Sequence, residues 1–151
     1  MKYLITILFF SFSSVGSAQT PEEIVKNTVD SFFEAFHARD SKGMNILIHA
    51  DARLQRTAPN AAGIQSLRVQ NFQELVAGIV SISDSTVFKE KLLSYAIQVD
   101  GPLAHVWTPY EFWLDAKLHH SGANSIQLFL DDGTWKIIYL VDSRTAEGVK
   151  E

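Results

Sequence analysis

Apolar residues recur at helical spacing in the stretch that begins at Pro21. The apolar side of this stretch contains Val25, Val29, Phe32 and Phe36. A stripe of this width is typical of a helix that packs on a core. Thr20 and Glu23 form a capping box, and Pro21 suits the first helical position. The pattern therefore predicts a helix from Pro21 to about Ala38.

Two further helices and one short strand are predicted before residue 88. Asp40 is a suitable N-cap for a short helix over residues 41–50, which Gly43 weakens. Residues 52–59 predict a short strand. Helical spacing returns in residues 67–82, where the apolar positions are Phe72, Leu75, Val76, Ile79 and Val80.

From Phe88 onward the apolar period changes to two, which is typical of strands with one face on a core. Three turn signals follow, at residues 100–102, 115–117 and 131–133. They divide the C-terminal half into four long antiparallel strands. The order of elements predicts an α+β domain with three N-terminal helices on one face of a curved, mainly antiparallel sheet.

The strand register can be predicted because residues symmetric about a tight turn pair across neighbouring strands. The concave side is expected to carry Tyr95, Ile97, Val106, Thr108, Tyr110, Phe112, His120, Asn124, Tyr139 and Val141. The outer side is expected to carry His105, Trp107, Glu111, Trp113, Phe129, Ile138 and Leu140. Pro109 and Gly122 fall at nearly the same height on neighbouring strands, which predicts a bulge or bend there.

The predicted outer face is too apolar to be left in water. We therefore expect a homodimer through this face. The residues expected in its interface are Trp107, Trp113, Phe129 and Leu140.

Residues 1–18 have the pattern of a cleaved signal peptide, with Lys2, an apolar run over residues 4–12 and small residues up to Ala18. The run is too short to span a bilayer. We expect a periplasmic or secreted protein with one domain over residues 19–151 and no stable membrane insertion after cleavage. The chain has no cysteine, which excludes disulfides and lipid attachment to a cysteine. Its net charge of −4, without a basic cluster, argues against nucleic acid as a partner.

The segments "HVWTPYEFWLDAKLHHSGANSIQL" and "GTWKIIYLVDSR", after a helical half with an aromatic first helix, resemble the nuclear transport factor 2-like (SnoaL-like) superfamily. Within it, the chain is most similar to the bacterial branch labelled lumazine-binding. The resemblance covers essentially the whole mature chain. It implies a cone-shaped α+β barrel, commonly dimeric through the outer sheet face, with a pocket between the helices and the concave sheet. It leaves the activity open, because the superfamily includes isomerases, dehydratases, cyclases and non-catalytic modules.

The sequence predicts neither a metal site nor a cofactor. His119 and His120 are adjacent on a strand, so their side chains are expected on opposite faces and unable to bind one ion. His105 shares a face with His119 but lies about 26 Å away at strand rise. Phosphate-binding loops and zinc-binding helical motifs are absent from the sequence.

The candidate ligand-binding residues are those that combine a polar group with a predicted place on the concave side. Asn124 and three tyrosines suit the orientation of a small, flat, partly polar molecule. His120 is the candidate general acid or base, because a histidine pKa can be tuned to act near neutral pH. His49, with Arg53 nearby, is expected at the pocket mouth. The ligand-binding set is therefore Tyr95, Tyr110, His120, Asn124, Tyr139 and His49.

Three functions agree with these patterns. The first is an exported module, binding or accessory, for a small hydrophobic or flat polar molecule. The second is an enzyme of the isomerase, dehydratase or cyclase type that uses His120 as general acid or base. The third is a non-catalytic domain for dimerisation or protein interaction, in which the interior of the cone is filled.

Overall fold

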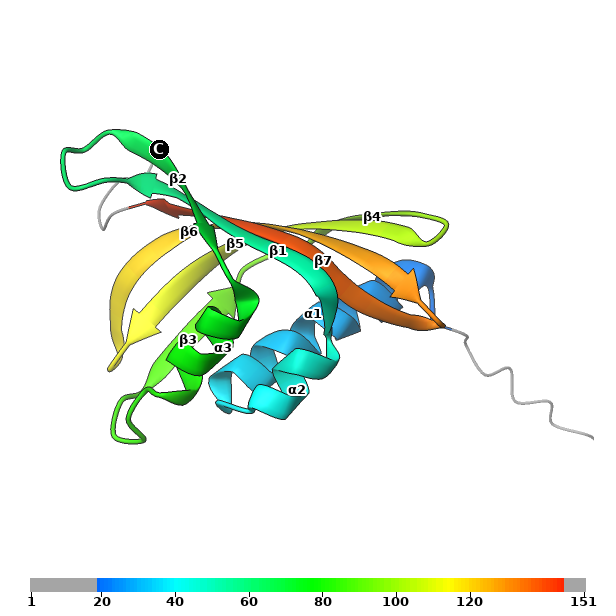
Figure 1. The fold of residues 1–151 in the computed structure, drawn as a ribbon, viewed down its shortest axis with the longest axis horizontal. Coiled ribbons are helices and arrows are strands. Elements are labelled where there is room, and N and C mark those ends of the chain that lie inside the picture. The colour runs from blue at the N-terminus through cyan, green and yellow to red at the C-terminus, as the bar shows by residue number, and fades with distance from the viewer. Residues whose placement is uncertain (1–18, 146–151) are drawn as a thin grey trace, which may run out of the picture.

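The computed structural model describes residues 19–145, which form helices and one seven-stranded sheet (Figure 1). The helices are α1 (Pro21–His37), α2 (Ser41–Ile46) and α3 (Phe72–Val80). The strands are β1 (Ile48–Pro59), β2 (Gln65–Gln70), β3 (Phe88–Leu92), β4 (Ala96–Asp100), β5 (Leu103–Leu114), β6 (Lys117–Asp131) and β7 (Thr134–Thr145). The predicted signal peptide lies outside the described residues.

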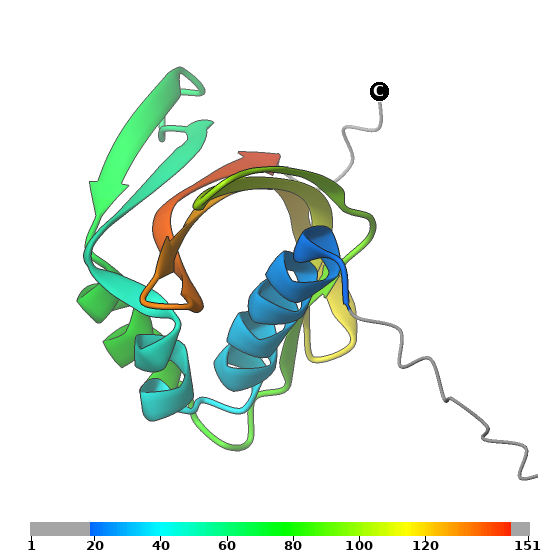
Figure 2. The same cartoon turned by 90° about the vertical axis from the view of Figure 1, so that its right-hand side faces the viewer.

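The sheet has the strand order β2-β1-β7-β6-β5-β3. Strand β4 also pairs with β5, along the same edge that β3 uses. All pairs are antiparallel except β1 with β7. The sheet curves around α1, and α2 and α3 lie below its β1 end (Figure 2). The predicted α+β architecture, with helices against the concave face of a curved sheet, is confirmed.

Helix α1 is the central element of the core, and its predicted caps are present. The Thr20 hydroxyl accepts from the Glu23 backbone N–H, and the Glu23 carboxylate accepts from the Thr20 backbone N–H. Its buried face consists of Val25, Val29, Phe32, Phe33 and Phe36. These side chains pack against the inward residues of β5, β6 and β7, which include Val106, Ile126, Leu128 and Ile137.

The middle of the chain differs from the prediction in two places. Residues 48–50, expected at the end of the second helix, begin β1. Residues 65–70, expected partly in the third helix, form β2, and Asn71 caps α3 one residue later. The pairing of β2 with β1 supplies the tertiary hydrogen bonds that override the helical spacing at Leu67.

The three turn signals of the C-terminal half are confirmed. The β5–β6 turn places Asp115 and Ala116 at φ of 47° and 61°, and the β6–β7 turn places Asp132 and Gly133 at 47° and 78°. Positive φ at both central residues is the geometry of a two-residue type I′ turn, whose twist matches that of the strands it joins. The first of the four predicted strands is interrupted at residues 93–95 and forms β3 and β4.

Two β-bulges interrupt the pairing of the C-terminal strands, and the second of them changes the predicted faces. His119 is the extra residue of β6 between the pairs Phe112–His120 and Trp113–Leu118. Ile138 is the extra residue of β7 between the pairs Leu128–Ile137 and Gln127–Tyr139. Beyond a bulge the two faces of a strand exchange.

The bulge at Ile138 makes the predicted faces wrong for the second half of β7. Leu140, expected in the outer interface, is 5% exposed and belongs to the core. Tyr139 and Val141, expected on the concave side, lie on the other face. Trp107 and Phe129 lie outside as predicted, with 46% and 37% of their surface exposed.

A bulge or a bend was predicted at Pro109 and Gly122; the register is continuous there, so the bulge is absent. Pro109 falls between the segments of β5 that pair with β4 and with β3, where its missing N–H is tolerated. Gly122 permits a close approach of two strands, because a Cβ there would lie 1.8 Å from the carbonyl oxygen of Ser143. Within residues 19–145, no helix is long and apolar enough to cross a membrane.

Candidate functional site

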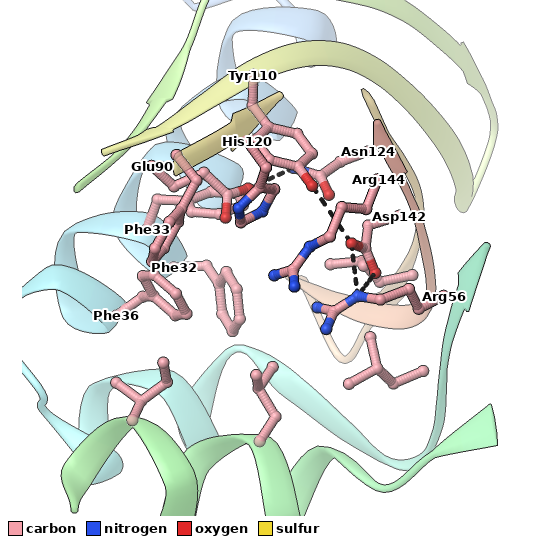
Figure 3. Close-up of a pocket in the computed structure, with 15 residues that line it drawn as sticks. Phe32, Phe33, Phe36, Arg56, Glu90, Tyr110, His120, Asn124, Asp142 and Arg144 are labelled. Atoms are coloured by element: carbon pink, nitrogen blue, oxygen red, sulfur yellow. Dashed lines mark hydrogen bonds and ion pairs between the residues drawn. The ribbon is translucent and has the colours of Figure 1, made fainter. Parts of the chain in front are cut away.

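A cavity of about 210 Å³ lies between the concave sheet and helices α1 and α3 (Figure 3). Its apolar lining consists of Phe32, Phe33, Phe36, Leu54, Leu75, Ile79, Phe112 and Leu140. Its polar lining consists of Arg56, Glu90, Tyr110, His120, Asn124, Asp142 and Arg144. The cavity therefore has an apolar side formed mainly by the helices and a polar side formed by the sheet.

A buried ion pair joins the two parallel strands at this site. The register of β1 and β7 places Arg56 beside Asp142, and the Arg56 Nε–H donates to both carboxylate oxygens at 2.9 and 2.8 Å. The Tyr110 hydroxyl donates to the Ser143 carbonyl oxygen at 3.1 Å and lies 3.4 Å from Asp142 Oδ2. Burial, with the negative charge of Asp142 nearby, raises the Tyr110 pKa, so the phenol stays protonated.

Glu90 faces the cavity from β3, between the inward residues Phe88 and Leu92. The Asn124 amide donates to Glu90 Oε1 at 2.7 Å, and the Glu90 backbone N–H donates to His37 Nε2 at 2.9 Å. Burial raises the Glu90 pKa to about 7, although the hydrogen bond from Asn124 opposes the shift. Glu90 therefore changes its charge near neutral pH.

His120 lies in the cavity wall because of the bulge at His119. Its ring stacks on Phe112 with ring centroids 4.9 Å apart, and it meets the Tyr110 ring edge-to-face at 5.7 Å. Burial lowers the His120 pKa to about 4, and the Arg144 charge acts in the same direction. The imidazole is consequently neutral at neutral pH.

The expectation that the adjacent histidines point to opposite faces was wrong. Their Nδ1 atoms lie 2.9 Å apart, because the bulge interrupts the alternation of side chains. In the part of the chain that the structure describes, no group of three or more metal-binding side chains comes together.

Arg144 lies two residues after Asp142 on β7 and therefore on the same face. Figure 3 shows its guanidinium group pointing into the cavity. None of the ion pairs within residues 19–145 includes Arg144. Its buried Nε–H finds no hydrogen-bond acceptor among the same residues.

The structure brings three of the predicted ligand-binding residues together in the cavity wall, namely Tyr110, His120 and Asn124. The other three lie elsewhere. Tyr95, between β3 and β4, donates its hydroxyl proton to Asp30 of α1. Tyr139 follows the bulge residue Ile138 and lies on the outer face, where its hydroxyl donates to Gln55 Oε1. His49 lies 6.3 Å from the Phe129 ring and borders a separate open groove.

Four charged residues of the cavity were not predicted from the sequence, namely Arg56, Glu90, Asp142 and Arg144. Glu90 did carry a signal, since the alternation in "FKEKL" places it on the same face as two apolar residues. A carboxylate at such a position is unusual unless it has a role or a partner. The paired charges of "DSR" at the end of an apolar strand are a second signal of the same kind.

Comparison with solved structures identifies the fold. An NTF2-like protein from Cytophaga hutchinsonii superposes with a TM-score of 0.69 at 14% identity and covers 84% of this chain and 100% of its own. A candidate dehydratase of the NTF2-like family from Streptomyces avermitilis gives 0.63 at 17% identity, with 82% and 95% covered. The beta subunit of a candidate aromatic-ring-hydroxylating dioxygenase from Novosphingobium aromaticivorans gives 0.65 at 11%, with 85% and 92% covered.

The protein therefore has the nuclear transport factor 2-like fold, an α+β cone with a cavity between its helices and its sheet. No protein-family model and no curated protein sequence matches the chain. At these identities the structural matches establish the fold alone, and the expected lumazine-binding branch is not confirmed by them.

Proposed function

We propose that the protein is an exported module that binds one small molecule in the cavity between its helices and the concave sheet. The observation that carries the proposal is the cavity itself, in which phenylalanines lie opposite a group of polar side chains. Ligand sites commonly combine apolar walls with a few polar groups that fix orientation. Export to the periplasm or beyond rests on residues 1–18, whose sequence has the pattern of a signal peptide.

The volume of the cavity limits the size of the ligand. An apolar cavity of about 150 Å³ is known to hold one benzene molecule. A cavity of about 210 Å³ accommodates a single ring, or a short branched chain, with one small polar substituent. The flat, partly polar molecule expected from the sequence agrees with this size.

Native mass spectrometry of protein purified without refolding tests the proposal. We expect the wild type to carry a small molecule of defined mass. Leu75→Trp should lose this mass, because Leu75 lines the cavity and the larger side chain fills it. Leu93→Trp is the matched control, since Leu93 is exposed and outside the cavity lining. A wild type without any adduct, or the same adduct on the cavity variant, would contradict the proposal.

An enzyme is the second candidate function, and the charged residues of the cavity favour Glu90 over His120 as its proton acceptor. A general base works best when its pKa is close to the working pH. The Glu90 pKa is raised to about 7, whereas that of His120 is lowered to about 4. In an enzyme, Glu90→Gln would abolish turnover of the co-purified molecule and leave its affinity nearly unchanged.

The third function, a filled cone used only for association, has less support because a cavity with polar groups is present. Association is still compatible with ligand binding. The outer face exposes Leu103, Trp107 and Phe129, and β5 and β6 place Leu103 directly opposite Phe129. We propose a homodimer that covers this patch and Trp113, without the buried Leu140.

A further inference from the structure

Arg144 brings a positive charge into the cavity. No carboxylate within residues 19–145 forms an ion pair with it. A guanidinium group cannot lose its proton in a protein, and it presents five N–H donors. Its buried Nε–H lacks an acceptor in the described chain. Burying such a donor without a partner is costly, so the arrangement is that of a binding group for an anion.

The second arginine of the cavity does not share this property. Arg56 is neutralised by Asp142, to which its Nε–H donates twice. Figure 3 shows its guanidinium group reaching the cavity from the same side as that of Arg144. Arg56 can therefore add a hydrogen bond to a bound anion, whereas the charge that attracts the anion belongs to Arg144.

A carboxylate fits this site better than a phosphate does. The two coplanar oxygens of a carboxylate match the planar fork of a guanidinium, and its single charge balances the single unpaired cation. A phosphate dianion would place a second charge near Asp142 and Glu90. It would also leave the phenylalanine side of the cavity without a contact, since an inorganic ion has no apolar part.

We propose that the cavity binds the anion of a small aromatic or branched carboxylic acid, with its carboxylate on Arg144 and its apolar body against Phe32, Phe36 and Phe112. The inference rests on the proposed function, because it names the chemical class of the ligand for the same cavity. Neutral molecules of the same shape bind more weakly, since they leave the Arg144 charge without a counterion.

Glu90 makes the binding depend on pH. The Asn124 amide holds one Glu90 oxygen in the cavity wall, so an anion on Arg144 lies near this carboxyl group. A bound anion favours the protonated form of Glu90, whose pKa of about 7 is set mainly by burial. Binding above neutral pH therefore takes up a proton. The titratable and charged groups that face Glu90 are His37 of α1, Arg56 of β1, Tyr110 of β5, His120 of β6, and Asp142 and Arg144 of β7.

Isothermal titration calorimetry with benzoate, benzamide and inorganic phosphate tests the assignment. The wild type should bind benzoate more tightly than the isosteric neutral benzamide and should not respond to phosphate. Arg144→Met should lower the benzoate affinity by about 10- to 100-fold, because a charge-assisted hydrogen bond is lost. The benzamide affinity of the same variant should be nearly unchanged. Arg53→Met is the matched control, because Arg53 is exposed in the separate groove beside His49.

The outcomes separate this inference from the proposed function. Equal affinity for benzoate and benzamide, or displacement of benzoate by phosphate, overturns the carboxylate assignment and leaves a small-molecule cavity intact. A loss of benzoate binding in Arg53→Met but not in Arg144→Met moves the anion site to the groove and also overturns it. If none of the probes binds and the purified protein carries no adduct, both the assignment and the proposed function fail.

The wild type alone supplies a measurement that does not depend on the folding of Arg144→Met. Titrations at pH 8 in buffers of different ionisation enthalpy should reveal proton uptake with benzoate, and the affinity should fall as pH rises above about 7. Glu90→Gln should bind benzoate with an affinity that is independent of pH. Proton uptake that persists in Glu90→Gln, or a flat pH profile of the wild type, would refute the role of Glu90.

Discussion

Removal of one member of the Arg56–Asp142 pair tests the energetic account of the site. The Asp142 side chain is 6% exposed and that of Arg56 is 25% exposed, so the pair is shielded from solvent on the Asp142 side. Arg56→Met takes away both strong hydrogen bonds of the carboxylate and leaves only the Tyr110 hydroxyl at 3.4 Å. Breaking a buried pair in this way costs about 3–5 kcal/mol, and the partial exposure of Arg56 favours the lower end.

The double variant Arg56→Met/Asp142→Leu should recover most of this loss, because no buried charge is then left without a partner. Apolar replacement of a whole buried pair is often neutral, so we expect the double variant within about 1 kcal/mol of the wild type. The free energies of unfolding come from urea titration of the mature protein, and the four proteins form a double-mutant cycle. Losses that simply add in the double variant, or an Arg56→Met loss below about 1 kcal/mol, would show that the unpaired Asp142 carboxylate does not carry this cost.

Four further outcomes are expected. The free energy of unfolding of the wild type should fall relative to that of Glu90→Gln as pH rises from 4.5 to about 7, because the folded state holds the Glu90 proton more tightly than the unfolded chain does. The raised Glu90 pKa corresponds to a fall of about 3 kcal/mol. Parallel stability curves for the two proteins would contradict this expectation. Gly122→Ala should destabilise the fold by about 1–3 kcal/mol in urea titration, because its Cβ would meet the Ser143 carbonyl oxygen, and a change within error would contradict the close approach. Sedimentation equilibrium should show a dimer that Trp107→Lys converts to a monomer, whereas a monomeric wild type would remove the proposed interface. The intact mass of the exported protein should correspond to cleavage after Ala18, and a full-length mass would exclude the signal peptide.

The sequence was sufficient for the parts of the fold in which local signals agree. The caps of α1, its apolar stripe and the three turn signals of the C-terminal half are local signals, and the structure contains the elements that they predict. Pairing across the predicted turn at residues 115–117 also placed Tyr110, His120 and Asn124 correctly on the concave side, because the bulge at His119 offsets the shorter turn that the structure has.

The rest of the site depends on a bulge that the sequence does not mark. Residues 137–141 are all apolar, so the sequence does not show which alternate residues of β7 face the core before and after Ile138. The tertiary pairing selects the extra residue, which turns Leu140 inward and brings Asp142 and Arg144 into the cavity. The single parallel pairing in the sheet, which places Arg56 beside Asp142, joins strands more than eighty residues apart and has no local signal.

Nitrogen-15 NMR of the arginine side chains tests whether Arg144 binds a carboxylate, because it observes the proposed binding group itself. Titration with benzoate should shift the Nε–H resonance of Arg144, which Arg144→Lys identifies by its disappearance from the spectrum. We expect a saturable shift at Arg144 with little change at the exposed Arg53. An unchanged Arg144 resonance at a benzoate concentration that saturates the calorimetric signal would show that Arg144 does not bind the carboxylate.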